Sequence, residues 1–103
     1  MTSTYKQIPG CIQRRESFTG FSMSGRYEAG LGWHSGRLIG AAAQSYYDAK
    51  YGSDLLARSL YVVRSYGTPI GWEDCGVWTV PLDKYSSTTS RHQSVLTSAI
   101  REA

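Results

Sequence analysis

Residues 60–100 read LYVVRSYGTPIGWEDCGVWTVPLDKYSSTTSRHQSVLTSAI and contain the clearest structural pattern in the chain. β-Branched and aromatic residues are concentrated in 60–66 and 77–80, which is typical of strands. Between them, Gly67 indicates a bend, and Pro69 cannot donate to a β-ladder. The stretch therefore predicts a three-stranded meander over 60–66, 69–73 and 77–80.

A helix is expected after this meander. Ser90 and Gln93 match a capping box, in which the two side chains satisfy free N–H groups at a helix start. Apolar residues then follow at helical spacing, namely Val95, Leu96, Ala99 and Ile100. The pattern predicts a terminal helix over 90–102.

Two helices and one strand are expected before the meander. Apolar residues recur every three or four positions over 37–51, which predicts an amphipathic helix with Gly52 as its stop. Pro9 suits the first turn of a short helix within 7–18, with Ile8 and Ile12 on its inner side. Frequent glycines surround one short strand over Phe21–Tyr27.

These elements together predict an α+β fold. A chain of 103 residues with 41% hydrophobic content fits one domain, 1–103, with one core. We expect a small antiparallel sheet of three to four strands, packed on one face by the 37–51 and 90–102 helices.

Charge and cysteine usage restrict the class of protein. The net charge of +3 permits an anionic partner without requiring one. Cys11 and Cys75 are widely separated, as are His34 and His92, so we expect free thiols, a reducing compartment, and neither a metal site nor a cofactor. The first residues lack the pattern of a signal peptide, which favours a cytosolic protein.

A hydroxyl-rich, basic segment precedes and opens the terminal helix. Helix starts carry free N–H groups and the positive end of the dipole, so they attract anions. The alternative is that one hydroxyl caps the helix while the others bond within a turn. The candidate anion or partner surface comprises Lys84, Ser87, Thr88, Thr89, Ser90, Arg91, His92 and Gln93.

Three aromatic residues are candidates for an interaction surface: Tyr66, Trp72 and Trp78. Tryptophans in a small domain more often fill the core. Trp72 and Trp78 flank the same predicted turn, which would place them as a pair across the strands. If exposed, such rings stack on bases or anchor a protein partner.

The segments SYGTPIGW (65–72) and KYSSTTSRHQ (84–93) carry a further pattern, with Trp78 between them. It resembles a family of small, uncharacterised bacteriophage proteins in which an SYGTPI strand is followed by a tryptophan-bearing strand and a KYSxTTSxHQ helix start. The resemblance covers roughly Ser65 to Gln93. It implies an infected bacterial cytoplasm and a small accessory protein that binds host machinery, and it carries over no activity and no site residues.

Three hypotheses of function follow. The first is a noncatalytic phage accessory protein that binds a host protein through an aromatic and arginine-bearing surface. The second is nucleic-acid binding, in which Lys84, Arg91, Arg14 and Arg15 neutralise phosphates while an aromatic ring stacks on a base. The third is a hydrolase or nuclease that uses His92 beside Arg91.

Overall fold

The structure is a computed structural model that describes residues 6–28, 40–55, 60–74, 76–81 and 87–102. Within these ranges the elements are α1 (Ile8–Arg14), β1 (Phe18–Gly20), β2 (Met23–Glu28), α2 (Gly40–Leu55), β3 (Leu60–Ser65), β4 (Thr68–Asp74), β5 (Val77–Thr79) and α3 (Ser87–Glu102). The predicted α+β class is confirmed, and the described part of the sheet has five strands where three to four were expected.

The strands form one sheet in the order β1-β2-β3-β4-β5, and every neighbouring pair is antiparallel. The predicted meander is confirmed as β3, β4 and β5. Tyr66 and Gly67 form the loop between β3 and β4, with positive φ angles of 51° and 84°. Two such residues are typical of a type I′ turn, whose twist matches that of the strands it joins. The bend expected at Gly67 is therefore a tight hairpin turn.

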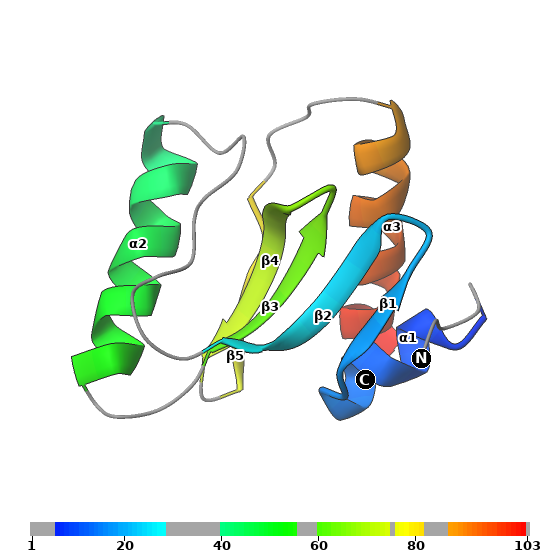
Figure 1. Cartoon of the computed structure of the whole chain (residues 1–103), viewed down its shortest axis with the longest axis horizontal. Coiled ribbons are helices and arrows are strands. Elements are labelled where there is room, and N and C mark those ends of the chain that lie inside the picture. Colours follow the sequence, from blue (N-terminus) through cyan, green and yellow to red (C-terminus); the bar gives the residue numbers. More distant parts are fainter. Residues whose placement is uncertain (1–5, 29–39, 56–59, 75, 82–86, 103) are drawn as a thin grey trace.

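β3 is buried on both faces, and this sets the layering of the fold. Leu60 and Val62 pack on the side of α2, whereas Tyr61 and Val63 lie in the opposite cluster, with α1 and α3. Successive side chains of a strand point to opposite faces, so an unbroken apolar run needs cover on both sides. Figure 1 shows α2 on one side of the sheet and α1 with α3 on the other. The two main helices thus cover opposite faces, whereas one shared face was expected.

The cluster under α3 depends on a close approach of this helix to β4. The approach occurs at Gly71, where an added Cβ would overlap the side chain of Leu96. α1 packs beside α3, and its Ile8 and Ile12 are fully buried in the same cluster. The predicted short helix, with proline near its start and these two isoleucines inside, is confirmed.

Two boundaries differ from the expected ones. The strand expected over 21–27 begins at Met23, because Phe21 belongs to the turn between β1 and β2. The helix expected over 37–51 continues through Gly52, which is therefore not its stop. A glycine inside a helix costs only about 1 kcal/mol relative to alanine. The packing of α2 on the sheet offsets a cost of this size.

We expect alanine to have opposite effects at two glycines. Apart from the chain neighbours and the adjacent backbone of α2, no atom of the described residues lies within 4 Å of a Cβ added at Gly52, so Gly52→Ala should stabilise the fold by about 0.5–1 kcal/mol. Gly71→Ala should destabilise it by about 1–3 kcal/mol, because the added methyl group would overlap the fully buried Leu96 side chain and force the packed core to shift. Urea unfolding of the two variants measures both effects, and shifts of the same sign would contradict this packing.

Candidate functional site

Two hairpin turns meet at one end of the sheet. Phe21 and Ser22 form the loop between β1 and β2, next to the Tyr66–Gly67 turn. The backbone N–H of Tyr66 donates to the carbonyl oxygen of Ser22 over 2.8 Å. We call this region the hairpin-tip site; it comprises Phe21, Ser22, Tyr66 and the underlying Ser65, Thr89 and His92.

Three residues of these turns have a left-handed backbone although none of them is glycine. The φ angles of Phe21, Ser22 and Tyr66 are 55°, 63° and 51°. This conformation costs a residue with a Cβ atom about 1–2 kcal/mol. Phe21 and Tyr66 are nevertheless 57% and 63% exposed. The turn backbone is therefore held by the structure around it and not by burial of the two rings.

A buried polar cluster lies beneath the turns. The hydroxyl of Ser65, at the end of β3, lies 2.7 Å from Nδ1 of His92 and 3.3 Å from Oγ1 of Thr89. Thr89 and His92 are three residues apart on α3, so they share one helix face. The Tyr66 ring stacks on the His92 ring, with centroids 6.0 Å apart and planes inclined by 27°. His92 therefore links the turn, the strand end and the first part of α3.

The environment of His92 favours its neutral form. Burial lowers the pKa of His92 below the ordinary value of 6.5, the positive charge of Arg91 lowers it further, and a hydrogen bond with the backbone of Phe21 acts in the opposite direction. Near pH 7 the folded protein therefore holds a neutral imidazole. A neutral ring has one donor and one acceptor, which fits a donor to the Phe21 backbone and an acceptor for the Ser65 hydroxyl.

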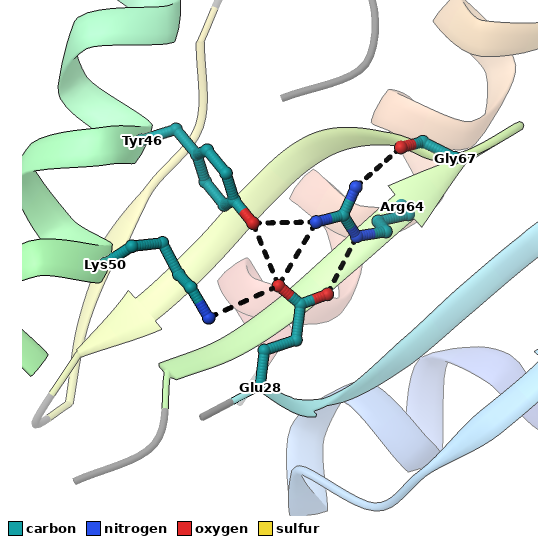
Figure 2. Close-up of polar contacts among 5 residues, drawn as sticks. All are labelled: Glu28, Tyr46, Lys50, Arg64 and Gly67. Atoms are coloured by element: carbon teal, nitrogen blue, oxygen red, sulfur yellow. Dashed lines mark hydrogen bonds and ion pairs between the residues drawn. The ribbon is translucent and has the colours of Figure 1, made fainter. Parts of the chain in front are cut away.

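A second buried polar cluster lies on the α2 face of the sheet (Figure 2). Arg64 holds Glu28 at two points, with Nε donating to Oε2 over 2.7 Å and Nη2 to Oε1 over 3.2 Å. The Tyr46 hydroxyl of α2 donates to Oε1 of Glu28 over 2.9 Å and accepts from Arg64 Nη2 over 2.7 Å. Lys50 Nζ lies 3.7 Å from the same carboxylate oxygen. Burial raises the pKa of Tyr46, so its hydroxyl keeps the proton that it donates.

This cluster supports the hairpin-tip site from within. Nη1 of Arg64 donates to the carbonyl oxygen of Gly67 over 2.6 Å, so one guanidinium joins Glu28 to the turn that carries Tyr66 (Figure 2). Glu28 is fully buried, and Arg64 is nearly so. The planar guanidinium donates in fixed directions. The turn is thereby held by Arg64 on one face of the sheet and by His92 on the other.

Within the hydroxyl-rich segment, the side chains that the structure describes are those of residues 89–93, and they do not converge on one point. α3 begins at Ser87, so Ser90 lies inside the helix and the expected capping box there is wrong. Successive residues of a helix are about 100° apart around its axis, so these five side chains point in different directions. Thr89 and His92 are buried, Ser90 and Gln93 are half-buried, and Arg91 is exposed. Ser87 and Thr88 lie in the first turn of α3, and Lys84 lies outside the described residues.

Of the three aromatic candidates, Tyr66 is the exposed one. Trp72 is 1% exposed and meets Tyr46 edge to face, with centroids 5.4 Å apart. Trp78 is half-buried and meets Tyr61 edge to face at 6.0 Å. The strand register does not place the two tryptophans opposite each other, and they lie on opposite faces of the sheet. The expected tryptophan pair across the turn is therefore wrong.

Sequence reasoning missed Phe21, Ser22 and Ser65 as parts of one site. The Phe21–Ser22 turn contains neither glycine nor asparagine, the residues that usually indicate a left-handed backbone. Ser65 was readable only as part of a strand. The one available signal was the alternation of side chains along the predicted strand 60–66. It indicates that Ser65 and Arg64 lie on opposite faces of the sheet.

Some kinds of site are absent from the described residues. Within the ranges given above, no group of three His, Cys, Asp or Glu side chains could hold a metal ion. None of the helices in that part of the chain is both long and apolar enough to cross a bilayer. Cys11 is a free, half-buried thiol, and Cys75 lies outside the described residues.

Comparison with known proteins assigns the chain to a family. A family model described as "Family of unknown function (DUF8033)" matches residues 10–99, a range that contains the whole hairpin-tip site. The chain belongs to this family. No curated protein and no solved structure matches it. The family description names no activity, so the function must be inferred from the site itself.

The lowered pKa of His92 predicts a loss of stability as the pH falls from about 7 to 5. In the unfolded chain His92 titrates with a pKa of about 6.5, whereas the folded protein has a lower pKa. The unfolded state therefore takes up the proton first and gains population. Urea unfolding at several pH values measures the slope. His92→Asn keeps an acceptor near Ser65 but does not titrate, so the unfolding free energy of this variant should depend less on pH. If the wild type and the variant show the same dependence on pH, His92 is not its source.

The buried ion pair predicts that substitutions of Arg64 and Glu28 have strongly coupled effects on stability. Arg64→Ala and Glu28→Ala should each cost about 3–5 kcal/mol of unfolding free energy, because each leaves the other charge buried without its main partner. The double variant should cost much less than the sum. Arg14→Ala removes the ion pair with Glu16, whose two side chains are 63% and 53% exposed, and should leave stability nearly unchanged. Additive effects of Arg64→Ala and Glu28→Ala would contradict the coupling.

Proposed function

We propose that this chain is a noncatalytic binding protein that recognises another protein through the hairpin-tip site. The observation that carries the proposal is the exposure of Phe21 and Tyr66, 57% and 63%, on two turns joined by a backbone hydrogen bond. Exposed aromatic side chains are frequent anchors of protein interfaces. Here hydrogen bonds within the domain hold the backbone that presents them, which lowers the entropic cost of association.

The setting of this proposal comes from the resemblance to small bacteriophage proteins over 65–93. That segment contains Tyr66 and His92, so it includes part of the hairpin-tip site. We propose that the protein is a phage accessory protein, that it acts in the cytoplasm of an infected bacterium, and that its partner is a host protein. It needs no cofactor for this role.

Nucleic-acid binding is the alternative, and it has less support. Arg14 pairs with Glu16 at 2.9 Å and Arg15 pairs with Glu73 at 3.3 Å, so carboxylates offset both charges. α1 packs beside the later part of α3, about two helical turns from Arg91. These cations therefore do not form one patch around the exposed rings, as a phosphate-binding surface would require.

A hydrolase or nuclease based on His92 and Arg91 has no supporting geometry. The two side chains leave α3 about 100° apart, and His92 is 3% exposed while Arg91 faces solvent. The hydroxyl that lies 2.7 Å from His92 Nδ1 is that of Ser65, which is 1% exposed. A nucleophile must reach its substrate, so this contact serves the structure of the site.

The proposal predicts a partner whose recovery depends on the two exposed rings. The wild-type protein and the double variant Phe21→Asn/Tyr66→Asn are immobilised and exposed to bacterial lysate, and bound proteins are quantified by mass spectrometry. Asparagine tolerates a left-handed backbone, so the turns should persist while both rings are lost. Recovery of the specific partner should fall by about tenfold or more, as expected for the loss of interface anchors.

Tyr51→Ala provides the matched control. Tyr51 lies on α2 and is 58% exposed, close to the value for Tyr66. Its loss should leave recovery unchanged. Equal recovery with the wild type and the double variant would contradict the proposal. Recovery of nucleic acid in place of protein, with binding that weakens as salt rises, would support the alternative.

A further inference from the structure

In the part of the chain that the structure describes, β5 forms the edge of the sheet on the side away from the hairpin β1–β2. Among the described residues, β5 pairs with β4 and with no other strand. Its outer N–H and C=O groups can therefore pair with an added strand. Val77, the first residue of β5, is 67% exposed. Sheet edges of this kind accept extended peptides by β-augmentation.

A groove lies along this edge, between β5 and α3. It consists of two hollows with volumes of about 390 Å³ and 420 Å³. Val80, Thr97 and Arg101 line both hollows, so the two hollows adjoin. Val80 continues the chain from β5, whereas Thr97 and Arg101 belong to α3. A strand added to β5 would place the side chains of one of its faces in this groove.

The two ends of the groove differ in their chemistry. Trp78 and Ile100 line one end and make it apolar. At the other end α3 presents Ser90, Ser94 and Ser98, which recur every four residues along one side of the helix. The apolar end suits an aliphatic side chain, and the small residues leave space for an extended backbone to pass close to the helix.

The charge within the groove identifies the kind of occupant. Arg101 lines both hollows, is exposed, and makes no ion pair with any residue that the structure describes. The described residues that line the groove include no Asp or Glu, and the whole chain carries a net charge of +3. An occupant with a carboxylate near Arg101 would complement this charge.

We propose that the groove binds an extended, acidic peptide segment of a partner protein, which pairs with β5 as an added strand. Side chains on one face of a strand repeat about every 6.8 Å. One such side chain, aliphatic, occupies the end lined by Trp78 and Ile100, and a Glu or Asp on the same face reaches Arg101. The exposed rings Phe21 and Tyr66 do not line this groove, so peptide binding does not rest on the function proposed for the hairpin-tip site.

The test uses fluorescein-labelled octapeptides in which valine and threonine alternate and one glutamate is moved through every position. A matched series carries glutamine instead. Fluorescence anisotropy with the full chain should show the tightest binding for glutamate at one or two positions. Arg101→Gln should weaken those peptides by about threefold to fivefold and leave the glutamine series unchanged, as expected for an exposed ion pair. Equal weakening of both series would overturn the role of Arg101.

Pairing with β5 has its own readout. N-methylation removes a backbone N–H, so methyl groups at alternate positions of the best peptide should abolish binding, and methyl groups at the intervening positions should not. If the effect of N-methylation on binding does not alternate along the peptide, the peptide does not add to β5 as a strand. Thr97→Trp should fill the groove and abolish binding, while Tyr66→Asn should bind the peptide as the wild type does. A Thr97→Trp variant that unfolds like the wild type and still binds would overturn the location.

A second copy of the chain is the competing occupant of this edge. Sedimentation of the wild type at micromolar concentrations should show a monomer. A dimer that Thr97→Trp dissociates, together with no binding of any octapeptide at millimolar concentration, would overturn the peptide proposal.

Discussion

The ion pair between Arg64 and Glu28 is the interaction on which the arrangement of the fold depends. The two residues come from adjacent strands, and their charges are removed almost entirely from water. Removing two charges from water costs several kcal/mol per ion, and only good geometry with further hydrogen bonds repays it. Tyr46 supplies such a bond from α2, and the Gly67 carbonyl supplies another from the hairpin turn. One guanidinium thus fixes the position of a helix, two strands and a turn, and these directional contacts select one arrangement of the layers.

Much of the fold was predictable because its elements are local. The meander over residues 60–80 follows from residue types and from a glycine where the turn requires a positive φ. The layering was less predictable. Leu60 to Val63 are all apolar, so no alternation reveals which residues face which helix. Glu28, Lys50 and Arg64 appear in the sequence as ordinary surface charges, and their burial depends on partners far away in the chain.

The candidate site was predictable only in part, for a geometric reason. The sequence singled out the segment Ser87–Gln93, but a helix directs neighbouring residues to different sides. His92 therefore joins the hairpin-tip site while Arg91 does not. The remaining members come from turns more than forty residues apart in the chain, as Ser22 and Tyr66 show. No spacing rule connects such positions, and only the antiparallel register of β2 on β3 brings them together.

The same register constrains how the chain assembles. β3, β4 and β5 are joined by short turns, so their contacts are local and can form early. β2 can pair with β3 only when the chain between them, residues 29–59, closes into a loop. This closure costs conformational entropy before any β2–β3 contact has formed. Glu28 ends β2 and must meet both Arg64 and Tyr46, so docking of the first hairpin and docking of α2 become one cooperative event. An isolated two-stranded hairpin is marginal in water. Residues 18–28, which form this hairpin, should therefore hold no lasting structure until β3 is available to pair with β2.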